Sequence, residues 1–106
     1  MKITINNKEI ELKYSFRAMM IFEKITGESF NPKGITEIMV YFYSTILASD
    51  RDIALTFEDF MEWIDEQPQT LNDFSEWLTK IVLKNKIFSD KEETSESEND
   101  VDLKKN

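Results

Sequence analysis

Residues 15–27 read SFRAMMIFEKITG and contain a helix together with its start and end signals. Ser15 is a suitable N-cap, because a serine hydroxyl accepts a hydrogen bond from a backbone N–H of the first helical turn. Gly27 suits the left-handed conformation that ends many helices. The pattern predicts a helix over residues 16–26. The apolar side chains that we expect on its inner side are Phe16, Met19, Met20 and either Ile21 or Phe22.

The residues before this helix predict a β-hairpin. In MKITINNKEIELKY, residues 1–14, apolar and polar residues alternate, which is typical of a strand pair with one buried face. We favour a turn at Asn7-Lys8, because it places Ile5 opposite Ile10, whereas a turn at Asn6-Asn7 would place Ile5 opposite Lys8. Asn7 tolerates the positive φ of a tight turn. A two-stranded ribbon is unstable alone, so its apolar face should lie on helices.

Three further helices are expected after residue 27. Residues 36–48 are apolar nearly all round, which is typical of a central, buried helix. Residues 56–64 (TFEDFMEWI) and 70–78 (TLNDFSEWL) match at a spacing of 14, and each begins with a threonine cap and an aspartate three residues later. We interpret this match as convergence of two capped helices, not as a duplicated repeat. Pro68 separates them, and the last helix should end near Lys86.

The composition changes after Phe88. Residues 89–106 contain seven acidic and three basic residues, and their large apolar residues are Val101 and Leu103. Such a segment cannot offset its ordering entropy by burial. The sequence therefore predicts a mainly α fold: a short N-terminal β-hairpin packed on a bundle of about four helices over residues 1–88, then a disordered acidic tail over 89–106. Solubility is the simplest role for the tail, and shielding a binding face is an alternative.

The composition also excludes several classes of function. The chain has no histidine and no cysteine, so it lacks the commonest general base, the commonest metal ligand and any thiolate nucleophile. We expect no enzyme, no cofactor and no metal site. Four acidic residues could be imagined as a metal or acid–base cluster, but we interpret them as a solvated helix face. They are Glu62, Asp65, Glu66 and Glu76.

The charge and hydropathy patterns bear on partners and location. The net charge is −8 and no cluster of lysine and arginine is present, which argues against nucleic acid as a ligand. The first residues lack the pattern of a signal peptide, and no apolar run approaches the roughly 20 residues that cross a bilayer. We expect a cytoplasmic protein that does not enter a membrane. A domain this short gains stability from self-association or from a partner.

The candidate residues for binding a partner are methionines and tryptophans. Met19, Met20, Met39 and Met61 are candidates for lining an adaptable groove, although core packing is the competing interpretation. Tryptophan is favoured as a binding anchor where it is exposed. The set that we select as candidates for partner binding is Met19, Met20, Met61, Trp63 and Trp77.

Residues 1–88 resemble a known family. A hairpin around Asn7-Lys8, the stretch FRAMMIFEKITG (residues 16–27), three further helices and a charged tail are similar to the tail assembly chaperones of long-tailed phages and prophages. The stretch FEKITG, residues 22–27, is the sharpest part of the likeness. The resemblance implies a non-enzymatic chaperone that binds the tape measure protein, keeps it soluble and helps recruit tail tube subunits.

Two other functions remain open at this point. The first is an acidic inhibitor or decoy that blocks a nucleic-acid-binding protein, and the second is a small structural component of a phage particle. Binding by an inhibitor would depend on carboxylates and would weaken with added salt. Binding by a chaperone would depend on apolar groove residues.

Overall fold

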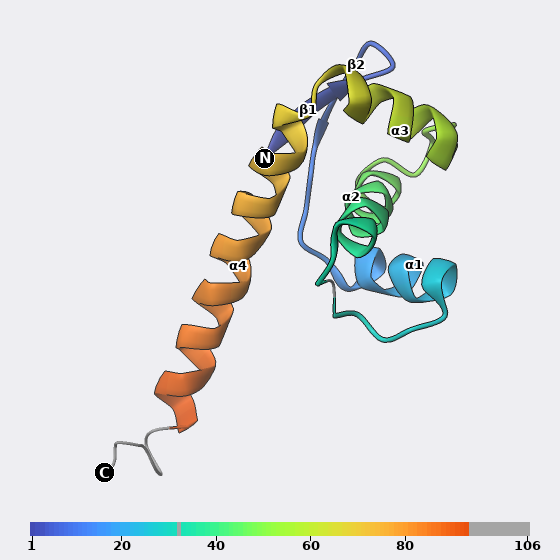
Figure 1. Cartoon of the computed structure of the whole chain (residues 1–106). Coiled ribbons are helices and arrows are strands. Elements are labelled where there is room, and N and C mark those ends of the chain that lie inside the picture. The colour runs from blue at the N-terminus through green and yellow to red at the C-terminus, as the bar shows by residue number, and fades with distance from the viewer. Residues whose placement is uncertain (32, 94–106) are drawn as a thin grey trace. The chain divides into compact units, whose positions relative to one another are not determined.

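The computed structural model describes the backbone of residues 1–31 and 33–93, and the side chains of residues 1–31 and 33–84. The elements are β1 (Lys2–Ile5), β2 (Lys8–Glu11), α1 (Phe16–Thr26), α2 (Ile35–Ser49), α3 (Phe57–Glu66) and α4 (Gln69–Glu93) (Figure 1). The predicted mainly α fold with an N-terminal hairpin is confirmed. The chain divides into two units after Glu76, and the first of them comprises residues 1–76. The first unit contains the hairpin, α1 to α3 and the first residues of α4.

The register of the hairpin differs from the prediction. The turn is Asn6-Asn7, with φ values of 55° and 58°, and it pairs Ile3 with Ile10 and Ile5 with Lys8. The positive φ expected for Asn7 is confirmed, but the Asn7-Lys8 turn is wrong. A two-residue turn of this type needs positive φ at both central residues, and asparagine adopts that conformation more readily than lysine.

Lys8 lies opposite Ile5 and therefore on the apolar side of the ribbon. Its ammonium group is accommodated there by an ion pair, since Lys8 Nζ lies 2.5 Å from Asp50 Oδ2 at the end of α2. The same ammonium group is the main reason that the pKa of Asp50 lies below its ordinary value.

The hairpin packs on the helices, as predicted. Its buried residues are Ile3, Ile5, Ile10 and Leu12, the last of these just after β2. The indole Nε1 of Trp63 in α3 donates a hydrogen bond of 3.1 Å to the carbonyl oxygen of Thr4. The backbone N–H of Lys13 donates a bond of 3.2 Å to Ser49 Oγ in α2. The ribbon is thus held by both α2 and α3.

Both predicted ends of α1 are confirmed, but its inner side is only partly as expected. Ser15 Oγ accepts a hydrogen bond of 3.1 Å from the N–H of Ala18, and Gly27 has a φ of 74°. Ala18 and Phe22 are buried, whereas Phe16 and Met20 are 81% and 60% exposed. The inward placement of Phe16 and Met20 is therefore wrong. Residues four apart share one face of a helix, and the small Ala18 lets that face approach α2 closely.

The core forms around α2, which lies between α1 and α3 (Figure 1). The ring of Phe42 stacks on Phe74 of α4, with centroids 4.2 Å apart and planes at 4°, and it meets Phe60 of α3 edge-on at 5.3 Å. Tyr41 packs against Phe22 of α1 at 6.1 Å. The prediction of a central, buried helix is confirmed.

The third and fourth helices, predicted to begin with the same threonine cap, begin differently. Thr56 Oγ1 accepts a hydrogen bond of 3.1 Å from the N–H of Asp59, so Thr56 is a cap. Thr70 is not a cap, because α4 already includes Gln69 and the N–H of Thr70 donates to the Gln67 carbonyl at 3.0 Å. The predicted Thr70 cap is wrong. Pro68 is the reason, since its fixed φ favours the start of a helix and begins the turn earlier.

Helix α4 extends to Glu93, beyond the predicted end near Lys86 and beyond residue 88, where we expected the helical domain to end. Lysine and glutamate, which are frequent in this stretch, are good helix formers. The remainder of the predicted acidic tail, residues 94–106, lies outside the described residues. Among the helices described, none combines the length and apolar content that crossing a bilayer requires.

Candidate protein-binding groove

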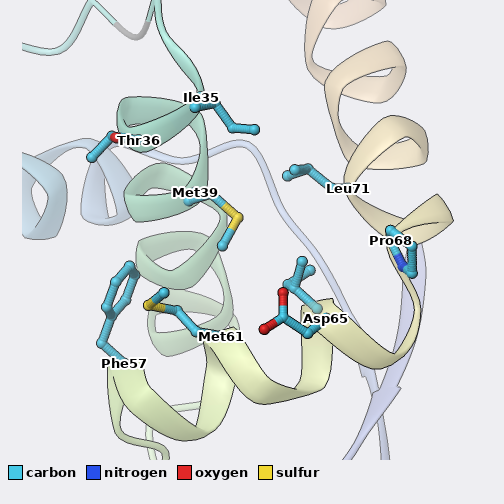
Figure 2. A pocket seen from close by; sticks show the side chains of 9 residues that line it. Ile35, Thr36, Met39, Phe57, Met61, Asp65, Pro68 and Leu71 are labelled. Carbon is cyan, nitrogen blue, oxygen red and sulfur yellow. The ribbon is translucent and has the colours of Figure 1, made fainter.

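An open groove of about 370 Å³ lies between α2, α3 and the start of α4, within the first unit (Figure 2). Three helices and the α3–α4 connection contribute to its walls. The residues that line it are Ile35, Thr36 and Met39 from α2, Phe57, Met61, Ile64 and Asp65 from α3, Pro68, and Leu71 from α4. Eight of these nine side chains carry no charge, so the groove is a mainly apolar surface.

Helical spacing explains why these side chains meet. Ile35 and Met39 are four residues apart on α2, and residues 57, 61 and 64 form a stripe along one face of α3. Figure 2 shows the side chains of Ile35, at the start of α2, and Leu71, in the first turn of α4, pointing toward one another. Ile35 is 69% exposed and Met61 is 43% exposed. The groove therefore presents large apolar side chains that the fold itself leaves uncovered.

The start of α2 is fixed by a carboxylate. Glu37 Oε1 accepts hydrogen bonds from the backbone N–H groups of Gly34 at 2.8 Å and Lys33 at 2.9 Å. These two bonds, the one from Gly34 first, hold the pKa of Glu37 below its usual value of 4.5. Because Ile35 and Thr36 follow directly, this contact orients the α2 wall of the groove.

The segment that contributes α3 and the start of α4 to the groove is strongly acidic. Residues 52–76 contain eight acidic residues and no basic residue, a charge equal to the net −8 of the whole chain. Asp65 is the charged residue of the lining, and it is exposed. Among residues whose side chains are described, no lysine or arginine forms an ion pair with Asp65. The apolar groove is therefore bordered by a negative charge that no described side chain neutralises.

The structure does not bring the five predicted binding residues together. Met61 lines the groove, and so does Met39, which was considered as a groove residue. Met19 and Met20 lie on α1 and do not line it, although Met20 borders a separate hollow of about 300 Å³ with Arg17 and Lys24.

The two tryptophans have different surroundings. Trp63 is half-buried, meets Phe42 edge-on at 5.9 Å and bonds to the hairpin, so it serves the packing of the fold. Trp77 is half-buried and belongs to the second unit. The groove residues that sequence reasoning missed include Ile35, Phe57 and Leu71. Their signal in the sequence was the helical spacing of Ile35 with Met39 and of Phe57 with Met61.

The acidic residues considered as a cluster, Glu62, Asp65, Glu66 and Glu76, are all exposed. Within residues 1–31 and 33–84, no group of three or more acidic side chains is arranged to hold a metal ion.

Comparisons with protein-family models, with curated proteins and with solved structures gave no match. The functional inference therefore depends on the groove, on its charged border and on the sequence resemblance.

Proposed function

We propose that this protein is a non-enzymatic tail assembly chaperone of a long-tailed phage or prophage. It acts in the host cytoplasm, where it binds the tape measure protein, keeps it soluble and helps recruit tail tube subunits. The observation that carries the proposal is the apolar groove of α2, α3 and α4 with its exposed residues Ile35 and Met61. The resemblance of residues 1–88 to this family supports it.

The groove suits the task physically. A long helical protein with apolar faces aggregates unless a partner covers them, and an amphipathic helix is commonly covered by laying its apolar side in a groove. Methionine adapts to irregular partners because its side chain is unbranched and flexible, and both Met39 and Met61 line this groove. Many copies bound along one long target would turn weak single contacts into strong overall binding.

The groove also bears on the alternative of an acidic decoy. A protein that blocks a nucleic-acid-binding partner by charge alone has no use for an exposed isoleucine and an exposed methionine facing one hollow. Large apolar side chains left uncovered in one place are typical of a surface that binds protein. The chaperone function is therefore favoured over the decoy.

Co-expression with a tape measure fragment tests the proposal, and the chain offers a matched pair of variants. Met61 in the groove and Met20 on α1 are both exposed methionines on helices, so glutamine at either position should leave the fold intact. We expect the wild type and Met20→Gln to keep the fragment soluble. Met61→Gln combined with Ile35→Gln should lower the soluble fraction several-fold, with unchanged circular dichroism.

Two results would contradict the proposal. If the fragment is no more soluble with the wild-type protein than without it, the chaperone function is wrong. If Met20→Gln abolishes the effect while the groove variant retains it, the binding surface lies on α1 and not in the groove.

A further inference from the structure

The acidic residues of α3 follow a pattern relative to the groove. At 3.6 residues per turn, the apolar stripe of Phe57, Met61 and Ile64 is flanked on one side by a stripe of Glu58, Glu62 and Asp65. Helix α3 reads FEDFMEWIDE and contains five acidic residues and no basic one. The opposite flank of the apolar stripe turns into the core through Phe60, which is fully buried. The exposed border of the groove along α3 is thus a continuous line of carboxylates.

Within the described side chains, no cation compensates this line of carboxylates. Glu58 and Glu62 are four residues apart, as are Glu62 and Glu66, and like charges at this spacing repel one another. In the part of the chain with described side chains, the two ion pairs are Met1–Glu11 and Lys8–Asp50, and neither includes a residue of α3. A cation beside this border would therefore relieve repulsion that the protein itself leaves in place.

We propose that the groove selects amphipathic helices that carry lysine or arginine along one edge of their apolar stripe. The apolar side chains of such a helix would enter the groove, and its cations would lie against Glu58, Glu62 and Asp65. The inference rests on the proposed function in one respect, namely that the groove receives a helix. It adds the charge and the pattern of that helix.

Selection by charge has a measurable signature. A helix with the same apolar stripe but glutamate along its edge would face the carboxylates of α3 and be repelled. The preference for the basic helix should weaken with salt, because these carboxylates are exposed and the screening length is about 8 Å at physiological ionic strength and about 3 Å at 1 M. The apolar part of the binding should persist at high salt, which distinguishes this site from a purely electrostatic decoy.

Two synthetic helical peptides test the inference on the full-length protein. Both carry the same leucine and methionine stripe, one with lysine along its edge and the other with glutamate at the same positions. We expect the lysine peptide to bind at least tenfold more tightly at 50 mM salt in fluorescence anisotropy, and this ratio to fall several-fold at 500 mM salt.

Charge variants locate the effect. Asp65→Asn with Glu62→Gln should reduce the preference for the lysine peptide several-fold. Glu9→Gln with Glu28→Gln removes the same charge at exposed positions away from the groove and should leave the preference unchanged. Equal binding of the two peptides overturns the inference, and so does an equal loss in both double variants, since net charge alone would then account for it.

The outcomes also separate this inference from the proposed function. If a tape measure fragment is kept soluble by the protein but the two peptides bind equally, charge selection fails and the chaperone function stands. If the lysine peptide is preferred but the fragment is not kept soluble, charge selection stands and the chaperone function fails. If neither peptide binds and the fragment precipitates, both are wrong.

Discussion

The two tyrosines of α2, Tyr41 and Tyr43, have phenolic hydroxyl groups in different environments. Tyr41 is fully buried, and its hydroxyl makes no hydrogen bond of ordinary geometry with the described residues; the effect of burial on its pKa is partly offset, but not outweighed, by the Thr45 side chain. Its ring lies among Phe22, Phe30 and Phe74. Tyr43 is half-buried, and its hydroxyl donates a hydrogen bond of 2.6 Å to the carbonyl oxygen of Leu55. Replacement of each by phenylalanine should therefore change stability in opposite directions.

The magnitudes follow from the two environments. Burying a hydroxyl without a partner costs about 1–3 kcal/mol in mutational data. Because Thr45 partly compensates the Tyr41 hydroxyl, Tyr41→Phe should raise the free energy of unfolding by about 1 kcal/mol, at the low end of this range. For a unit of this size, 1 kcal/mol corresponds to a rise in Tm of about 4–8 °C. Tyr43→Phe leaves the Leu55 carbonyl unsatisfied and should lower the free energy of unfolding by about 1 kcal/mol.

Alkaline pH provides a second signature of Tyr41. Burial raises its pKa to about 12 from an ordinary 10.0. The folded protein holds the phenolic proton more tightly than the unfolded chain, so stability is complete below pH 10 and is lost as the pH rises toward 12. The loss is about 1.4 kcal/mol per pH unit and up to about 3 kcal/mol in total. Tyr41→Phe cannot ionise, so its advantage over the wild type should grow across this range.

Urea denaturation followed by circular dichroism measures these differences. The wild type and both variants would be compared at pH 8 and at intervals between pH 10 and 12, with equal m-values as the check that the folded states are alike. If Tyr41→Phe is destabilised as much as Tyr43→Phe, and its pH dependence matches that of the wild type, the contact with Thr45 fully satisfies the Tyr41 hydroxyl and the prediction is wrong.

Three further predictions concern the helix ends and the hairpin. Thr56→Ala should lower the free energy of unfolding by about 1 kcal/mol, because it removes a helix cap. Thr70→Ala should change it by less than about 0.5 kcal/mol. Equal losses of the two variants in thermal unfolding would mean that Thr70 is a cap as well. Gly27→Ala should lower the free energy of unfolding by about 1–2 kcal/mol in the same assay. The loss comes from the φ of 74° alone, because a Cβ at this position meets nothing within 4 Å. An unchanged Tm would mean that the turn is not left-handed. Lys8 depresses the pKa of Asp50, so this ion pair contributes stability above pH 3.8, the ordinary pKa, and the contribution is lost as the pH falls through the lower pKa of the folded protein. The difference in stability between the wild type and Lys8→Gln should therefore disappear at acid pH. A difference that persists there would contradict the pairing.

The local features of this fold could be predicted from the sequence. The ends of α1 depend on Ser15 and Gly27, and the start of α3 depends on Thr56, so each is decided within one helical turn. The central position of α2 followed from its nearly uniform apolar composition. Such features need no knowledge of distant residues.

Features that depend on distant residues were predicted wrongly. The hairpin register was rejected because it placed Lys8 on the apolar side, and nothing near Lys8 in the sequence indicates that Asp50 will lie against its ammonium group. Phe16 and Met20 were placed inside because they are apolar. The buried residues of α1 are instead Ala18 and Phe22, the second of which was one of the two alternatives offered by the sequence.

The candidate site was predictable only in part. Met61 was selected because it is flexible and apolar, and it does line the groove. Ile35 and Leu71 come from the ends of two other helices, and their convergence on Met61 depends on how α2, α3 and α4 pack. Trp63 was selected as an anchor, but its indole is engaged by the Thr4 carbonyl.

The bond between Trp63 and Thr4 joins residues 59 positions apart, and this separation affects synthesis on the ribosome. At about 5–20 residues per second, β1 is made about 3–12 s before its partner in α3. During that interval the apolar side of the hairpin lacks part of its cover, and the unpaired edges of a two-stranded ribbon are open to other nascent chains. The charged side chains of Lys2, Glu9 and Glu11 along these strands are suited to discourage such pairing until translation reaches α3.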